Sequence, residues 1–339
     1  MGNKAGWIVA GVLVLGVGAI VAYMIIGSMF DDAPSPPTSA TTGFGALDFK
    51  DTTVPPTQVL GSLPSGAGNA ADDYAQAARV YRSNRELCKG IIDKMPTRYK
   101  EAPKLADVDL AVLKQIDQFV AAGAAKAKMD FVFTHTPREF TVGWYYRPGC
   151  ELMNVGKCLE ALAGDYASRK EYAQAEQVLK HMITLGWHMV QERAVACVTW
   201  LGQDMQLLAL SRLANDVYLP WRGRDDKQIA VVREYAIALD TFGAALTTKL
   251  KILQVAKPAP GDVFNIIAHD KDRAWRIQGI LTLGVLKYVS VQDNDRKHSE
   301  KLIEKYCASQ DPLEAAAAKA ANAFERSRLE TYVMDDQPE

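Results

Sequence analysis

The chain has 339 residues, with 39 Lys or Arg against 40 Asp or Glu and a formal net charge of −1. Binding to phosphates needs a basic surface, and no basic stripe dominates any helical stretch, so the charge balance argues against nucleic acid as a partner. A chain of this length can bury a sizeable hydrophobic core.

The most hydrophobic stretch is Trp7–Phe30, which contains no charged residue. A membrane-spanning helix needs about 20 mainly apolar residues to cross about 30 Å of hydrocarbon. The sequence therefore predicts that residues 1–30 are a short tip and a transmembrane anchor that contacts the lipid bilayer through residues 7–30. The first alternative is a cleaved signal peptide, but its apolar core is normally shorter and small residues mark its cleavage site, whereas the bulky Met29 and Phe30 end this run. The second alternative is a buried helix of a soluble protein.

Charges on either side of the anchor predict its orientation. Lys4 and the terminal amine precede the run, while Asp31 and Asp32 follow it. The positive-inside rule then places the N-terminus in the cytoplasm and the C-terminal bulk on the extracytoplasmic side.

Residues 31–69 are rich in Pro, Ser, Thr and Gly. Such a segment cannot bury enough apolar surface to offset the entropy of ordering, so we expect an extended linker. Two short apolar islands interrupt it, Phe44–Phe49 and Val59–Leu63. They are either part of the linker or a docking peptide that lies along the body or a partner.

A helical pattern covers residues 70–335, and an acidic tail at 336–339 follows it. Asn69 is a candidate N-cap of a first helix over 70–93, because its side chain can accept hydrogen bonds from free amides. Further helices are expected near 106–128, 151–169, 172–191, 193–215, 227–256, 272–290, 295–308 and 312–332. The strand signal is confined to Asp130–Tyr146, which predicts a short hairpin or an ordered loop.

Residues 151–186 carry small and apolar residues at the packing positions of two consecutive helices. These residues are Leu162, Ala163, Tyr166, Tyr172, Ala175, Leu179 and Met182. The small alanines allow the helices to approach closely, and the tyrosines fill the groove beside them. The segment resembles one tetratricopeptide-type helical hairpin.

The segment from His269 combines an acidic turn, an arginine on the next helix and small or apolar positions after it. The residues that carry this pattern are Asp270, Asp272, Trp275, Arg276, Gly279, Leu283 and Gly284. It resembles a HEAT-like repeat, and a second match begins at Asp311, close to one repeat of roughly 40–47 residues further on. The second match has Ala317 in place of the arginine that would brace the turn.

Together the two resemblances imply an all-α fold of stacked helical hairpins, similar to an α-solenoid. In such folds each hairpin needs its neighbours to bury its apolar face. The resemblance implies a scaffold for protein contacts and does not identify the partner.

One helix has apolar or small residues at alternating intervals of three and four. They are Ile229, Val232, Ala236, Leu239, Gly243, Leu246, Leu250 and Leu253. This seam favours internal packing, because further apolar residues widen the face beyond a coiled-coil seam. The alternative is a homo-oligomer assembled through helix 228–256.

Aromatic and cationic residues gather in one short segment, and we interpret them as a candidate binding site. They are His135, Arg138, Trp144, Tyr145, Tyr146 and Arg147. Aromatic and arginine side chains are enriched where partners bind. The alternative is that these aromatics plug the end of the helical stack.

The remaining polar residues give no catalytic or metal site. His181, His188 and Glu192 share a helix face, but the two imidazoles would stand about 10 Å apart, so a polar rim is the better interpretation. Five cysteines are present without CxxC spacing, and we expect them to be helix-buried thiols. No phosphate-binding glycine loop, GxSxG or HExxH motif occurs, so no cofactor is predicted either.

The leading hypothesis is a membrane-anchored helical-repeat scaffold that binds a protein or peptide partner on the extracytoplasmic side. The first alternative is a helical enzyme acting on an envelope substrate, with its site near His135–Arg147. The second alternative is the structural oligomer described above.

Overall fold

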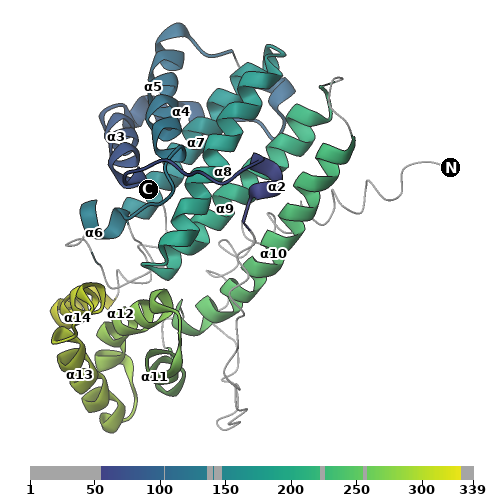
Figure 1. Cartoon of the computed structure of the whole chain (residues 1–339). Helices are drawn as coiled ribbons and strands as arrows, with labels where there is room; N and C mark the ends of the chain where they lie inside the picture. Colours follow the sequence, from purple (N-terminus) through teal and green to yellow (C-terminus); the bar gives the residue numbers. More distant parts are fainter. Residues whose placement is uncertain are drawn as a thin grey trace, which may run out of the picture. The chain divides into compact units, whose positions relative to one another are not determined.

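The computed structural model describes residues 55–102, 104–135, 140, 147–221, 226–254 and 258–329, all within one contact unit of residues 48–339. The described residues form helices and connecting loops without a β-strand (Figure 1), which confirms the predicted all-α body. Within this part of the chain, no helix combines the length and apolar character needed to cross a membrane. The predicted anchor Trp7–Phe30, residues 31–54 of the linker and the tail at 336–339 lie outside the described residues.

The body begins with three helices and a short 3-10 turn: α3 (Ala70–Ser83), α4 (Arg85–Ile92), η1 (Tyr99–Glu101) and α5 (Asp107–Ala124). Asn69 caps α3 as predicted, because its Oδ1 accepts from the Ala71 amide at 3.1 Å. The helix predicted over 70–93 is interrupted at Asn84, whose Nδ2 donates to the Val80 carbonyl at 2.9 Å. The side-chain bond of Asn84 takes up a carbonyl of the last turn of α3, so the helix can end there.

The segment before α3 runs alongside the segment after α5. Gly66 donates to the Ala125 carbonyl and accepts from the Ala127 amide, at 2.9 Å each. Asn69 forms two further bonds, because its Oδ1 accepts from the Asp130 amide at 2.9 Å and its Nδ2 donates to the Asp130 carbonyl at 3.2 Å. These four hydrogen bonds join the start of the body to the chain that leads into α6.

The strand prediction is wrong at its start, because α6 (Phe131–His135) is a helix. Glu192 Oε1 accepts from the Val132 amide at 2.6 Å and so satisfies a free donor at the start of α6. This bond from a distant carboxylate outweighs the β propensity of the Phe-Val-Phe sequence. Residues 136–139 and 141–146 of the predicted hairpin lie outside the described residues.

The middle of the body contains α7 (Arg147–Ser168), α8 (Tyr172–Glu192), α9 (Ala196–Arg212) and a π-helical turn, η2 (Leu213–Tyr218). Helices α7 and α8 pack against each other as the predicted pair. Most of its expected contact residues are fully buried, namely Leu162, Ala163, Ala175, Leu179 and Met182. The two tyrosines, Tyr166 and Tyr172, are partly buried against the core. Some polar residues of this segment are buried as well, among them Asp165 and Glu176.

Helices α8 and α9 also pack closely, and two glycines allow their approach. A Cβ atom on Gly202 would lie 2.6 Å from the Gly186 carbonyl oxygen, and one on Gly186 would lie 2.5 Å from the Gly202 carbonyl oxygen. Both distances are shorter than real Cβ contacts, so only glycine fits at this crossing.

The long helix α10 (Asp226–Gln254) packs against α9 and against a single helical turn, α2 (Thr57–Leu60). On the described part of the predicted seam, Ile229, Val232 and Leu239 are buried, which confirms internal packing there. Val59 of α2 is also buried in the same core. The second apolar island of the predicted linker thus lies on the body, in agreement with the docking-peptide alternative.

The C-terminal helices are α11 (Pro260–His269), α12 (Arg273–Val289), α13 (Asp293–Cys307) and α14 (Pro312–Ala323), followed by a short turn, η3 (Arg326–Arg328). Helix α12 packs against the other three helices (Figure 1). Helix α11 lies between the helices expected at 227–256 and 272–290 and was not predicted. Proline is well suited to the first helical turn, where its missing amide is not needed, and Pro260 starts α11. Helix α14 ends at Ala323, earlier than the predicted 332, because Phe324 is extended.

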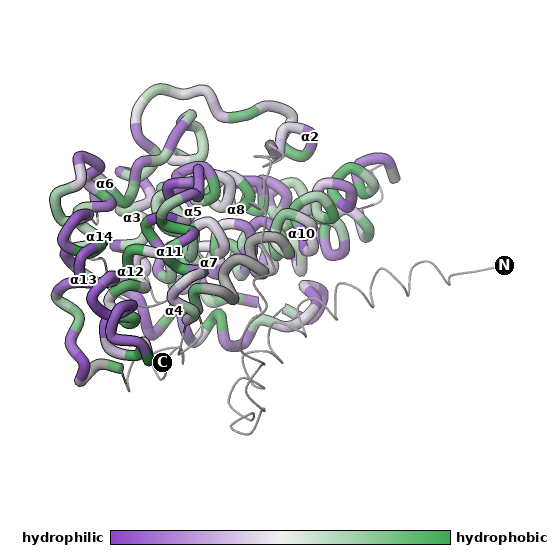
Figure 2. The backbone as a smooth tube through the Cα atoms, turned by 90° about the horizontal axis from the view of Figure 1, so that it is seen from below, coloured by the Kyte–Doolittle hydropathy of each residue, from purple (hydrophilic) through white to green (hydrophobic). Residues whose placement is uncertain are grey.

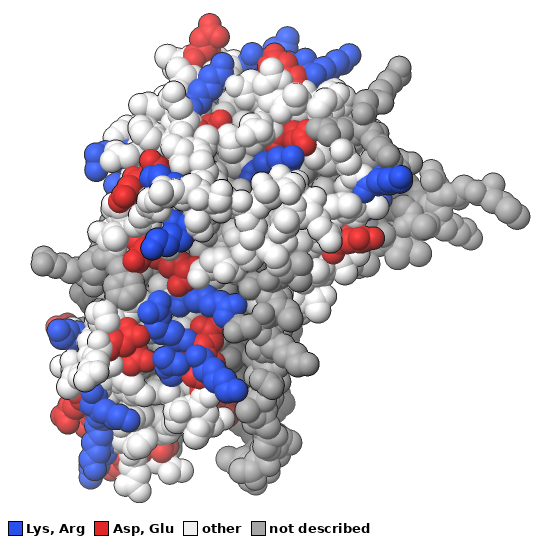
Figure 3. All heavy atoms as spheres, viewed as in Figure 1, with Lys and Arg blue, Asp and Glu red and all other residues white. Residues whose placement is uncertain are grey.

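The helices are amphipathic, and hydrophilic and hydrophobic residues alternate along the tube in Figure 2. Acidic and basic side chains are interspersed on the face shown in Figure 3. Ion pairs also join separate helices, such as Arg212 Nη2 with Glu160 Oε1 at 2.7 Å and Arg276 Nε with Glu314 Oε1 at 3.1 Å. Charges therefore contribute to the contacts between helices as well as to solvation.

Candidate functional site

A pocket of about 390 Å³ lies between α11 and α13. Both helices pack against α12, which leaves a groove between them. Its apolar lining consists of Phe264, Ile267, Ala268 and Leu302. Its polar lining consists of Asn265, His269, His298, Lys305 and Tyr306.

The spacing of residues on each helix explains how the lining forms. On α11, Phe264, Ile267 and Ala268 are three and four residues apart and therefore share a face. On α13, Leu302 follows His298 by four residues, so these two side chains also lie on one face. The pocket is thus built from two helix faces and needs no loop.

The opposite faces of both helices hold the groove in place. Val263 and Ile266 on α11 and Ile303 on α13 are buried. Gly279 on α12 brings α11 close, because a Cβ there would lie 2.7 Å from Ile267 Cγ1. Gly279 therefore allows α11 to approach α12 closely at Ile267, which lines the pocket.

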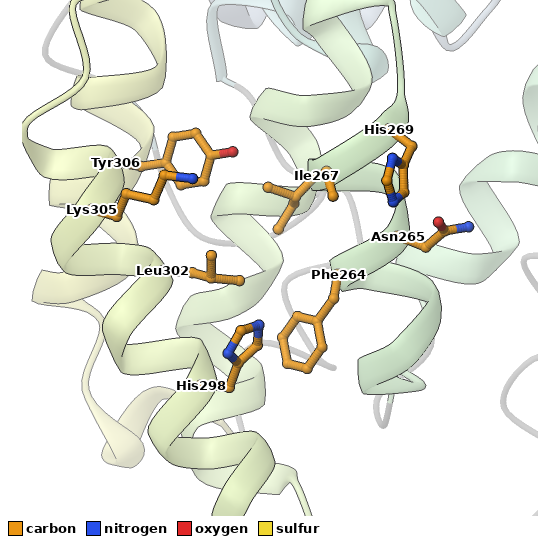
Figure 4. A pocket seen from close by; sticks show the side chains of 9 residues that line it. Phe264, Asn265, Ile267, His269, His298, Leu302, Lys305 and Tyr306 are labelled. Carbon is orange, nitrogen blue, oxygen red and sulfur yellow. The ribbon is translucent and has the colours of Figure 1, made fainter.

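Aromatic side chains and Lys305 face the space between α11 and α13 (Figure 4). The rings of Phe264 and His298 meet edge to face, with centroids 4.6 Å apart and an angle of 81°. Lys305 Nζ lies 5.3 Å from the centroid of the Tyr306 ring, whose hydroxyl pKa is raised by burial. No carboxylate is among the residues that line the pocket.

This arrangement suits binding better than hydrolysis. Its apolar centre can take one or two side chains, and Lys305 can attract a carboxylate at the edge. His269 and His298 come from separate parts of the lining (Figure 4), and no lining acid stands opposite either imidazole. General acid–base chemistry normally needs two such groups within reach of one substrate.

The predicted aromatic–cationic segment is described only at its ends. His135 Nε2 lies 3.0 Å from Asp72 Oδ1, and its ring centroid lies 5.3 Å from that of Phe131. Arg147 begins α7. Its side chain and the residues Arg138, Trp144, Tyr145 and Tyr146 lie outside the described part. The grouping of these six side chains therefore stays a prediction.

The predicted polar rim on α8 is wrong for His188, which is only 1% exposed. Its Nδ1 lies 2.7 Å from the Tyr74 hydroxyl on α3, and burial lowers the pKa of His188 to about 4. His181 Nδ1 lies 2.8 Å from Asp117 Oδ1 on α5, while Glu192 holds α6. The three side chains thus join α8 to three other helices.

No group of three or more His, Cys, Asp or Glu side chains in the described residues could hold a metal ion. The pocket was not predicted from the sequence, because α11 was not expected and no motif marks His298. The available signal was a proline that can start a helix, followed by the amphipathic stretch from Val263 to His269.

No protein-family model matches the chain, and no curated protein or solved structure matches it significantly. The function proposed next therefore depends on the groove between α11 and α13 and on the sequence patterns.

Proposed function

We propose that the protein is a membrane-anchored helical scaffold that binds a peptide segment of a protein partner on the extracytoplasmic side. The anchor is supported by the uncharged run Trp7–Phe30, and the orientation by Lys4 on one side and two aspartates on the other. The binding role is supported by the groove between α11 and α13.

We further propose that the body is built from HEAT-like and tetratricopeptide-like hairpins. In support, Arg276 Nη1 donates to the Asp270 carbonyl at 3.0 Å and so braces the turn before α12. Arg296 makes the equivalent bond one helix later, with its Nε donating to the Ser290 carbonyl at 2.6 Å. Both arginines reach back six residues, which gives successive helices the same kind of turn.

The lining of the groove indicates the chemistry of the peptide. Phe264, Ile267 and Leu302 offer an apolar surface for one large aliphatic or aromatic side chain. Lys305 lies at the edge of this surface with no lining acid to neutralise it. The best-fitting segment therefore carries a large apolar residue next to an aspartate or glutamate.

The test uses the full chain in lipid nanodiscs and fluorescent peptides that place leucine or phenylalanine beside either aspartate or lysine. We expect the acidic peptides to bind more tightly than the basic ones. Lys305→Glu should weaken acidic-peptide binding by about tenfold or more, because a favourable charge pair becomes a repulsive one. The measurement is fluorescence polarisation at two salt concentrations.

Lys301→Glu is the matched control, because Lys301 is an exposed residue of the same helix that does not line the pocket. It makes the same change in net charge four residues away. Equal losses for the two variants would show a general electrostatic effect and would contradict a specific site. Equal binding of the acidic and basic peptides would contradict the proposed peptide chemistry.

The aromatic–cationic segment from His135 to Arg147 is a second proposed contact. Trp144→Ala should weaken partner capture and leave the thermal midpoint unchanged. A matching loss of thermal stability would instead favour a purely structural role for this segment.

A further inference from the structure

The groove between α11 and α13 has an apolar end and a cationic end. Phe264 and His298 lie at one end, Leu302 lies in the middle and Lys305 lies toward the other end (Figure 4). His298 and Lys305 are exposed, so a segment of chain can reach both ends of the groove. A matching segment has large apolar side chains followed by acidic ones.

The chain itself carries such a segment shortly after α14. Residues 332–336 read Tyr-Val-Met-Asp-Asp, which is three apolar residues followed by two acids. This segment lies outside the described residues, which end at Leu329. The first apolar island also places Leu47 beside an aspartate, but Lys50 follows closely and balances the local charge. The segment after α14 therefore complements Lys305 better.

Hydrogen bonds hold the end of α14 beside the end of α12. Lys287 Nζ donates to the Asn322 carbonyl at 2.8 Å, and the Tyr288 hydroxyl donates to the Phe324 carbonyl at 2.9 Å. Since only three residues separate α12 from α13, the end of α14 also lies near the start of α13. The chain therefore leaves α14 near the first turns of α13, which carry the apolar end of the groove.

The chain after α14 is long enough to lie along the whole groove. Lys305 follows Asp293 by twelve residues, which is about 18 Å along the axis of α13, and crossing that helix adds about 10 Å sideways. Of the eleven residues from Phe324 to Asp335, three form the turn η3 and the other eight can extend, so together they span up to about 30 Å. Asp335 can therefore reach Lys305 while Met334 lies over the apolar lining.

We propose that residues 332–336 of this chain occupy the groove between α11 and α13 and compete there with the peptide partner. This inference rests on the proposed function, because it uses the same groove and the same peptide chemistry. A tethered segment has an effective concentration in the millimolar range. A groove with a dissociation constant of about 0.1 mM for the segment is then filled about nine-tenths of the time, which weakens the binding of a free peptide by about tenfold.

The first test measures fluorescence polarisation with the full chain in lipid nanodiscs and the acidic peptide that carries leucine beside aspartate. Met334→Ser removes an apolar side chain of the segment without changing the net charge. It should tighten binding of the free peptide several-fold, up to about tenfold. Val291→Ser is the matched control, because Val291 is 92% exposed and does not line the pocket, and it should leave the peptide affinity unchanged.

A second measurement locates the segment directly. The photo-crosslinker p-benzoylphenylalanine replaces Tyr332 with another aromatic side chain. After irradiation at low protein concentration, we expect crosslinks within one copy of the chain to α11 and α13, mapped by mass spectrometry. An excess of the acidic peptide should remove these crosslinks.

The outcomes separate this inference from the proposed function. Equal peptide affinities of the unmodified chain and Met334→Ser, together with weaker binding in Lys305→Glu, would retain the peptide site and overturn the inference. Crosslinks to α11 and α13 without binding of any free peptide would retain the inference and contradict an external peptide partner. Crosslinks between two copies of the chain, or tighter peptide binding in Leu47→Ser alone, would assign the groove to another occupant and overturn the inference as well.

Discussion

His188 and Glu192 lie one turn apart on α8, and burial shifts their pKa values in opposite directions. Burial lowers the pKa of His188 from 6.5 to about 4. Burial also raises the pKa of Glu192 from 4.5 to about 7, against the opposing effect of its hydrogen bonds to the α6 backbone. Folding therefore favours the neutral form of both side chains.

The two shifts give opposite dependences of stability on pH. The contribution of His188 is present above pH 6.5 and is lost as pH falls through about 4, because the unfolded chain takes up the proton first. The contribution of Glu192 is present below pH 4.5 and is lost as pH rises through about 7. Each contribution to the free energy of unfolding amounts to about 3 kcal/mol. Because one rises with pH and the other falls, their pH dependences nearly cancel in the unmodified chain.

The variant Glu192→Gln should reveal the contribution of His188. Glutamine keeps an oxygen that can accept from the Val132 amide, but it does not titrate. The free energy of unfolding of the variant, relative to the unmodified chain, should rise by about 3 kcal/mol between pH 4.5 and pH 7.5. Urea unfolding at four pH values across this range, followed by tryptophan fluorescence, measures this difference.

Glu86→Gln is the control, because Glu86 is an exposed glutamate on α4. Its stability profile should run parallel to that of the unmodified chain over the whole range. A difference between Glu192→Gln and the unmodified chain that does not change with pH would refute the reasoning. It would mean that Glu192 is already ionised in the folded protein near pH 5.

Three further changes test the packing and the caps. Gly202→Ala should lower the free energy of unfolding by about 2–3 kcal/mol through its clash with α8, while Gly261→Ala, where no atom lies within 4 Å, should have little effect in the same urea titration. Asn69→Ala should lower the free energy of unfolding by about 1–3 kcal/mol. Because Asn69 also bonds the backbone of Asp130, hydrogen exchange should become faster at the start of α6 as well as of α3. Arg276→Met should lower the free energy of unfolding by about 1–3 kcal/mol, because it removes the cation that pairs with Glu314 and leaves that carboxylate only its bond from the Ser309 hydroxyl. A double-mutant cycle with Glu314→Gln should recover part of this loss.

Features that depend on neighbouring residues could be predicted from the sequence. The cap at Asn69 was predicted correctly, because its side chain accepts from an amide only two residues later. The turn-bracing bond of Arg276 spans only six residues and follows from the HEAT-like pattern. Apolar periodicity likewise predicted the helices from α7 to α10 with small errors at their ends.

Features that depend on distant residues could not be predicted in the same way. The β-prone sequence of α6 is helical because Glu192, 60 residues later, accepts from its backbone. His188 looks like a surface residue by its helical spacing, yet Tyr74 from α3 encloses it. The groove requires α11 and α13 to pack against the same helix, α12, and no local sequence pattern predicts that arrangement.

The four hydrogen bonds around Gly66 and Asn69 have a mechanical consequence. Tension on the chain before Gly66 reaches the body through bonds to the end of α5 and to Asp130, as well as through α3 itself. Because Asp130 directly precedes α6, the same load passes to α6, which is hydrogen-bonded to Glu192 through the Val132 amide. Beyond the contact of α2 with α10, a pull on the N-terminal side is therefore shared among α3, α5 and α6, and α3 does not separate from the body alone.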